Sequence, residues 1–226
     1  MEIASVSLMA KEVGLLRRFY IEWLGFTEIE REGEEGFSIK VGSGVLRFFE
    51  GKEEREPFYH LAFNIPSNQF KEAKDWVRNK VSLNTERDRD EIFFERLGGR
   101  SFYFNEPAGN IVEFIAREHA TPRSAPFRAQ TCLNISEISL TVRNVVEASE
   151  ELQRIGLTSR DNDPINRAYL NFMGDDGSGC YLLLVEPGRR WIFSDQISEV
   201  HPLELVVKNR GTITVDEQGR LTVVTT

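Results

Sequence analysis

Three stretches of the chain begin with the same order of hydrophobic and polar positions. Residues 3–26, 58–80 and 135–157 each open with the alternation of a half-buried strand, break briefly, and continue with the apolar spacing of an amphipathic helix. Because an order that recurs along a chain indicates an internal repeat, these stretches predict three copies of one supersecondary unit.

The apolar stripe of each predicted helix follows the period of an α-helix. In the first stretch the stripe consists of Leu15, Leu16, Phe19, Trp23 and Leu24. In the second it consists of Phe70, Ala73, Trp76 and Val77, and in the third of Val145, Ala148, Leu152 and Ile155. Gly25 and Gly156 directly follow the first and third stripes, where a glycine favours the end of a helix.

Short strand-like pieces separated by turn residues follow each predicted helix. They occupy residues 36–42 and 44–51 after the first helix, 91–99, 100–106 and 109–118 after the second, and 168–176 and 180–188 after the third. Each unit therefore reads as β-α-β-β-β. The sequence predicts an α+β protein built from tandem βαβββ modules.

Module boundaries follow from where these patterns restart. Module one is predicted over residues 1–56 and module two over 57–118, and a linker rich in proline, alanine and polar residues follows over 119–132. A third, βαβββ-like module is predicted over 133–195, and residues 196–226 are predicted to add C-terminal strands that form a hairpin. A single helix covers only one face of a module's sheet. We therefore expect curled mixed sheets around a cleft, with the helices on the outer faces.

Composition narrows the class of protein. The 226 residues are 40% hydrophobic and 28% charged, which is typical of a globular domain. No apolar run approaches the roughly 20 residues of a transmembrane helix, and the N-terminus has no signal-peptide pattern. The net charge of −8 argues against nucleic-acid binding as the main role. Cys132 and Cys180 have no metal or redox spacing, so we expect reduced thiols and a cytoplasmic location.

A single acid interrupts an otherwise apolar strand. The segment YFNEPAGNIVEF, residues 103–114, reads as an aromatic strand, a cluster of turn formers and a second apolar strand with Glu113 in its middle. A buried strand favours valine or isoleucine at such a position. The Glu113 carboxylate is therefore expected to face solvent, the polar wall of a cavity, or a metal.

The tandem β-α-β-β-β order resembles the vicinal-oxygen-chelate superfamily, as do FYIEWLGF at residues 19–26 and FYFNEPAGNIVEF at residues 102–114. This group includes glyoxalase I, extradiol dioxygenases, and bleomycin and fosfomycin resistance proteins. The resemblance covers modules one and two well, and module three by its strand–helix start and general plan. It implies a metal in a cleft between paired modules, with ligands from a module's first and last strands. Those positions of module two hold His60 and Glu113.

Strand parity indicates which side chains face that cleft. Alternate residues of the first strand in module two form an apolar set toward the helix, which leaves His60 on the cleft side. The same alternation in the last strand places Glu113 there as well. The equivalent positions are Ser5 and Arg47 in module one, and Glu137 and Leu183 in module three.

Only module two offers a plausible pair of metal ligands. If modules two and three pair, Glu137 joins His60 and Glu113 as a His-Glu-Glu set for Fe, Mn, Ni or Zn. An extradiol dioxygenase site needs two histidines, so this set favours hydrolase-like or glyoxalase-like chemistry, with Glu113 also the candidate catalytic residue. Ser5 and Arg47 are candidate substrate-binding residues, because the fork of a guanidinium suits a carboxylate or phosphate.

Each of these residues also has a simpler interpretation. His60 can be a hydrogen-bonded cavity histidine, and Glu113 can form an ion pair with Arg47 in a site without a metal. Glu137 can pair with a neighbouring base or face water.

Two functions are therefore predicted. The first is a metal-dependent enzyme of isomerase, lyase or dioxygenase type, in which a divalent metal polarises two neighbouring oxygens of a small substrate. The second is a metal-free protein that binds or sequesters a small molecule, like the bleomycin resistance proteins. We expect a small-molecule ligand, no nucleic-acid or membrane partner, and a homodimer.

Overall fold

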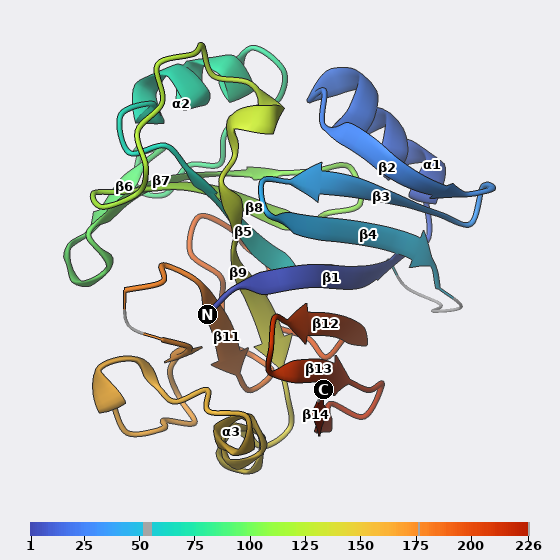
Figure 1. The fold of residues 1–226 in the computed structure, drawn as a ribbon, viewed down its shortest axis with the longest axis vertical. Helices are drawn as coiled ribbons and strands as arrows, with labels where there is room; N and C mark the ends of the chain where they lie inside the picture. Colours follow the sequence, from blue (N-terminus) through green and yellow to red (C-terminus); the bar gives the residue numbers. More distant parts are fainter. Residues whose placement is uncertain (52–55, 176, 226) are drawn as a thin grey trace.

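The protein is described by a computed structural model over residues 1–51, 56–175 and 177–225, where the strands form two seven-stranded sheets (Figure 1). The first sheet has the strand order β14-β13-β12-β1-β4-β3-β2. Its strands are β1 (Ile3–Ala10), β2 (Thr27–Glu32), β3 (Gly36–Val41), β4 (Gly44–Glu50), β12 (Leu203–Val207), β13 (Gly211–Val215) and β14 (Leu221–Thr225). This sheet joins module one to the C-terminal strands, including the predicted hairpin.

The second sheet has the strand order β10-β11-β9-β5-β8-β7-β6. Its strands are β5 (His60–Ile65), β6 (Ile92–Phe94), β7 (Gly99–Asn105), β8 (Ile111–Arg117), β9 (Asn134–Thr141), β10 (Asn171–Met173) and β11 (Tyr181–Val185). This sheet joins module two to module three. It thereby settles the pairing that the sequence left open.

Within each module the first strand lies parallel to the last: β1 beside β4, β5 beside β8, and β9 beside β11. The sheets are completed by antiparallel contacts between first strands, β5 with β9, and between β1 and β12. The predicted α+β architecture of tandem βαβββ modules in curled mixed sheets is confirmed. Module three has two strands after its helix, β10 and β11, at the two strand-like pieces of its sequence, and a loop with a short 3₁₀ helix precedes β10.

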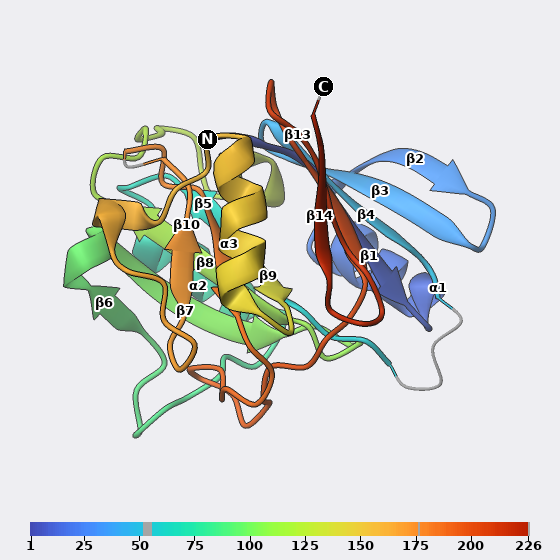
Figure 2. The same ribbon diagram turned by 90° about the horizontal axis from the view of Figure 1, so that it is seen from below.

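Helices cover the outer faces of the sheets. They are α1 (Val13–Arg17), its π-helical continuation η1 (Arg18–Trp23), α2 (Phe70–Arg78) and α3 (Val145–Arg154), with short 3₁₀ helices η2 (Glu95–Leu97), η3 (Ala129–Thr131) and η4 (Arg160–Asn162). The first helix packs on β3 and β4, and α2 packs on β7 and β8. Helix α3 contacts both β11 and β14, so it lies at the boundary between the two sheets (Figure 2).

Buried apolar residues form two clusters on opposite faces of the second sheet. The larger cluster includes Leu61 and Phe63 of β5, which face the helix side. The smaller cluster consists of Tyr103, Ile111, Tyr181, Leu183, Val185, Trp191 and Phe193. Trp191 and Phe193 of this smaller cluster follow β11 in the chain. The segment after β11 therefore covers the face of the sheet that is opposite the helix side. Polar side chains on this face are therefore shielded from solvent.

Both cysteines, Cys132 and Cys180, are buried and free. Burial raises the pKa of the Cys180 thiol to about 11, which keeps the thiol protonated at neutral pH. None of the helices in the described ranges is long and apolar enough to cross a bilayer.

Candidate functional site

A row of side chains crosses the second sheet at one level of its register. From β7 to β11 the paired positions are Tyr103, Glu113, Ala62, Glu137 and Tyr181. Residues directly opposite each other in neighbouring strands point to the same face, so this row places two carboxylates on either side of an alanine. His60 lies two residues before that alanine in β5 and shares its face.

The row brings His60, Glu113 and Glu137 together as a buried triad. The exposed fractions of the three residues are 4%, 3% and 3%. One donor atom from each of the three lies within 4.8 Å of the other two, and the His60 Nε2 to Glu113 Oε2 distance is 3.4 Å. Ala62 contributes only a methyl group between the carboxylates, which leaves room for their convergence.

Hydrogen bonding fixes how the His60 ring presents its nitrogens. The Nδ1 atom lies 3.2 Å from the carbonyl oxygen of Ile111. A carbonyl oxygen only accepts, so Nδ1 carries a proton, and Nε2 is the ring nitrogen that faces the Glu113 oxygen. Two lone pairs at 3.4 Å repel unless a cation lies between them, either a metal ion or a proton carried by Nε2 or by the carboxyl group.

Arg117 holds the second carboxylate from the end of β8. Its Nη2 atom donates to Glu137 Oε1 at 2.6 Å and to Ser136 Oγ at 3.1 Å, and its Nε atom donates to Asn64 Oδ1 at 3.1 Å. Burial raises the pKa of Glu137, the charge of Glu113 adds to this, and Arg117 opposes it. One guanidinium therefore serves a site with two buried carboxyl groups.

Tyr103 completes the polar row on the other side of Glu113. Tyr103 is paired with Glu113 in register across β7 and β8, and its ring stacks on Phe193 with the ring centroids 4.9 Å apart. Burial and the neighbouring carboxylates raise the pKa of Tyr103 well above its usual value. The phenol is therefore protonated at neutral pH and serves as a fixed donor beside the triad.

A cavity of about 550 Å³ opens directly onto the triad. Its walls include the aromatic side chains of Tyr103 and Trp191 as well as those of Phe93, Phe94 and Phe172. The Trp191 ring lies against His60, with centroids 5.1 Å apart. A mostly apolar cavity with a few convergent polar groups is the usual form of a small-molecule site.

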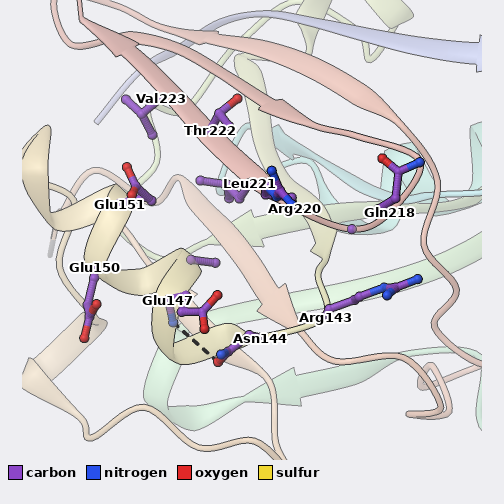
Figure 3. A pocket seen from close by; sticks show the side chains of 12 residues that line it. Arg143, Asn144, Glu147, Glu150, Glu151, Gln218, Arg220, Leu221, Thr222 and Val223 are labelled. Atoms are coloured by element: carbon purple, nitrogen blue, oxygen red, sulfur yellow. Dashed lines mark hydrogen bonds between the residues drawn. The ribbon is translucent and has the colours of Figure 1, made fainter.

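A second hollow of about 590 Å³ lies between α3 and β14 (Figure 3). Its lining is rich in charged side chains of both signs, among them Arg143, Glu147, Glu151 and Arg220. Asn144 in this hollow caps α3, because its Oδ1 accepts hydrogen bonds from the first-turn backbone. The polar side chains of the triad, in contrast, are all buried and bring their donor atoms within 4.8 Å of one another. The triad cavity is the better candidate site.

The donor set of the triad fits a divalent metal. One imidazole nitrogen and two carboxylates are ligands that Mn, Fe, Ni and Zn accept. A ligating histidine ordinarily donates its other ring N–H to a carbonyl or carboxylate, and His60 does so to Ile111. A cation at the triad also offsets the cost of burying an ionised carboxylate.

The structure does not bring Ser5 and Arg47 to this cavity. Ser5 lies in β1 and Arg47 in β4, so both belong to the first sheet. Arg47 forms its ion pair with Glu32, and the predicted alternative of an ion pair with Glu113 is wrong. The reason is the pairing of the modules: module two faces module three, whereas module one joins the C-terminal strands.

Sequence reasoning missed several residues around the triad. Arg117 stands at the edge of the predicted linker, although β8 continues to it and the alternation from Glu113 places it on the same face. That parity signal was available. Arg160, Arg189 and Trp191 lie in loops of module three, where no periodic pattern indicates which side chains turn inward.

Comparison with known proteins supports this picture of the fold. Residues 135–189 match the family model of the toxoflavin-degrading enzyme. A putative dioxygenase from Bacillus subtilis subsp. subtilis str. 168 aligns with 81% of this chain and 63% of its own, at 14% identity and a TM-score of 0.58. No curated protein matches the chain.

Shorter solved structures are also similar. Lactoylglutathione lyase from Agrobacterium tumefaciens aligns with 50% of this chain and 91% of its own, at 18% identity and a TM-score of 0.40. The fosfomycin resistance protein FosX from Listeria monocytogenes, in complex with Mn(II) and sulfate, aligns with 50% and 87%, at 22% identity and a TM-score of 0.38.

The strand topology and the comparisons agree on the fold. The chain has the fold of the vicinal-oxygen-chelate superfamily, as the sequence resemblance implied. The segment that matches the toxoflavin-degrading enzyme is module three, which contributes Glu137, Arg160 and Arg189 to the cavity.

Proposed function

We propose that the protein is a divalent-metal-dependent enzyme that binds a small oxygenated substrate at His60, Glu113 and Glu137. The observation that carries this proposal is the convergence of three buried donor atoms within 4.8 Å of one another on the floor of a cavity of about 550 Å³. The lone-pair conflict between His60 and Glu113 points in the same direction, because a bound cation removes it.

Fe, Mn, Ni and Zn are the metals that this donor set suits. A metal held there supplies Lewis-acid polarisation of two neighbouring substrate oxygens. The protein's own residues then have separate tasks. Arg117 orients Glu137 and opposes the rise in its pKa, the Ile111 carbonyl orients His60, and Tyr103 lies beside Glu113 in register.

The aromatic walls of the cavity exclude water and favour a substrate with a planar apolar body. Glu113 is the proposed catalytic residue, because it is a carboxylate at the metal position with a protonated neighbour, Tyr103. The similar proteins bear the names toxoflavin-degrading enzyme and putative dioxygenase. A single histidine in the triad favours isomerisation, addition or lysis over extradiol ring cleavage.

A second candidate function is binding without a metal. The ion pair of Arg117 with Glu137 and the 3.4 Å contact between His60 and Glu113 favour it, since a proton on His60 also reconciles these charges. The protein would then sequester a small molecule in the same cavity. Its cytoplasmic location and homodimeric state stay predictions from the sequence under either function.

Metal titration separates the two functions. Protein treated with EDTA is titrated with Mn²⁺, Fe²⁺, Ni²⁺ and Zn²⁺ by calorimetry. We expect one tight site per chain, with affinity lowered at least ~100-fold in His60→Ala, Glu113→Gln and Glu137→Gln, because each removes one of three ligands. Glu95→Gln is the matched control: Glu95 lines the same cavity but lies in η2, outside the triad.

Two results would contradict the metalloenzyme. One is a wild-type protein that binds none of the four metals. The other is metal binding that survives in all three triad variants as well as it does in the Glu95 control, because the metal would then lie elsewhere.

A further inference from the structure

Two more cationic side chains line the cavity that contains the triad. Arg160 in η4 and Arg189 in the segment after β11 come from loops, whereas the triad stands on strands. The Arg160 residue is only 7% exposed. In both guanidinium groups the Nη1 atom is buried and has no hydrogen-bond partner within the ranges that the structure describes.

The protein supports both guanidinium groups through aromatic rings. The Cζ atom of Arg160 lies 5.0 Å from the centroid of the Phe172 ring, and that of Arg189 lies 5.3 Å from the centroid of the Trp191 ring. The face of an aromatic ring stabilises the cation but accepts no hydrogen bond from the edge of the guanidinium. The Nη1 N–H groups of both arginines therefore stay available to a ligand. Burial lowers the pKa of Arg189, and the charge of a neighbouring arginine adds to this.

The same rings connect the arginines to the triad. The Trp191 ring, which carries Arg189, lies 5.1 Å from the His60 ring between centroids. The Tyr181 ring centroid lies 5.8 Å from the Arg160 Cζ, and Tyr181 is paired in register with the glutamate of β9. A ligand that occupies the cavity therefore meets both the triad and the arginines.

A buried charged donor without an acceptor is costly, and an anionic oxygen is its best partner. Arg96 on the rim of the cavity is exposed, and its Nη2 atom is bonded to Asp161 and Asp163. Arg160 also donates to Asp161, through Nε at 3.2 Å, but its Nη1 atom, like that of Arg189, is buried without an acceptor among the described residues. The aromatic walls around them suit a flat, apolar body attached to the anionic group.

We propose that Arg160 and Arg189 form an oxyanion subsite that binds a carboxylate or phosphate of an aromatic substrate, while the reacting oxygens of that substrate lie at the triad. The position of the reacting end rests on the proposed function. The oxyanion subsite itself requires no metal, so it is testable on metal-free protein.

Wild-type protein freed of metal with EDTA is titrated by calorimetry with benzoate, phenyl phosphate and benzamide. Benzamide is a neutral probe close in size to benzoate. Both anions bind, and benzamide binds at least ~10-fold more weakly, because a charged acceptor strengthens each guanidinium hydrogen bond. The tighter of the two anions identifies the group that the subsite prefers.

Variants locate the subsite. Arg160→Gln and Arg189→Gln each weaken binding of the preferred anion about tenfold and leave benzamide binding unchanged, since each loses one charged donor. Arg96→Gln is the matched control, because its guanidinium lines the same cavity but is exposed and has no buried donor without an acceptor. Its affinity for the anion equals that of the wild type. If a variant fails to fold, the comparison of anion with amide binding on wild-type protein still tests the subsite.

Three results would overturn the subsite: benzamide binding as tightly as the anions, no anion binding at millimolar concentration, or Arg96→Gln weakening the anion as much as the inner variants. Metal titration of the same wild-type preparation keeps the two proposals apart. Metal binding without anion binding contradicts the subsite alone. Anion binding without metal binding contradicts the metalloenzyme and leaves the subsite in place.

Discussion

Replacing Arg117 by methionine should destabilise the metal-free protein severely. Arg117 is 2% exposed and provides the ion pair of Glu137 at 2.6 Å. Leaving a buried carboxylate without its partner costs about 3–5 kcal/mol. Loss of the two 3.1 Å bonds to Asn64 and Ser136 adds about 1 kcal/mol each. The expected fall in the free energy of unfolding is therefore about 5–7 kcal/mol.

The assay is urea denaturation in EDTA, followed by circular dichroism. The double variant Arg117→Met with Glu137→Gln should recover about 3 kcal/mol, because the second change removes the stranded charge. Adding Zn²⁺ should also restore stability to the single variant, since a cation at the triad replaces the lost guanidinium charge. Arg154→Met is the control: Arg154 is exposed and pairs only with Glu151 on the surface of α3, so its effect stays within about 0.5 kcal/mol.

A single variant that loses no more stability than the Arg154 control would contradict a stabilising ion pair between Arg117 and Glu137. So would effects of the Arg117 and Glu137 changes that simply add. Additivity would mean that the two side chains do not compensate each other's charge in the folded protein.

Two further predictions concern other positions. Ala62→Leu should lower the affinity for metal at least ~100-fold in calorimetric titration, because the larger side chain fills the space between the carboxylates, and it should cost about 1–3 kcal/mol of stability. Ala62→Ser, whose side chain stays small, should bind metal as the wild type does. Equal metal binding by both variants would contradict this geometry. Burial raises the pKa of Glu106 from 4.5 to about 7 despite hydrogen bonds from the amides of Ala108 and Asn110. The folded state then binds a proton more tightly than the unfolded state, so the free energy of unfolding falls by about 3 kcal/mol as the pH rises from about 4.5 to about 7. In Glu106→Gln, the free energy of unfolding measured by denaturation should fall less steeply across this pH range than in the wild type. An unchanged pH dependence would mean that other groups cause it.

The repeated strand–helix order made most of the fold predictable. In three stretches the period of the hydrophobic positions changes from two residues to 3.6 at matching places. This change is a local property of the sequence, and it indicated β5–α2 and β9–α3 correctly. Parity then placed His60 and Glu113 on one face, because the direction of a side chain in a strand depends only on its position.

Other features depend on partners that are distant in sequence. The pairing of β1 with β12, and of β5 with β9, determines that Glu137 rather than Arg47 meets Glu113. No local pattern specifies that choice, because each module offers a similar edge. The inward turn of Arg160 and Arg189 depends on loops packed against aromatic rings, and it too has no periodic signal.

The most direct test of the central claim is a crystal structure of the protein with Zn²⁺, using anomalous scattering recorded at the zinc absorption edge. The account predicts one strong anomalous peak per chain, about 2.0–2.2 Å from His60 Nε2 and from one carboxylate oxygen each of Glu113 and Glu137. A triad with no peak, in crystals where His60 Nε2 donates its own proton to Glu113, would contradict the account and leave a metal-free binding protein.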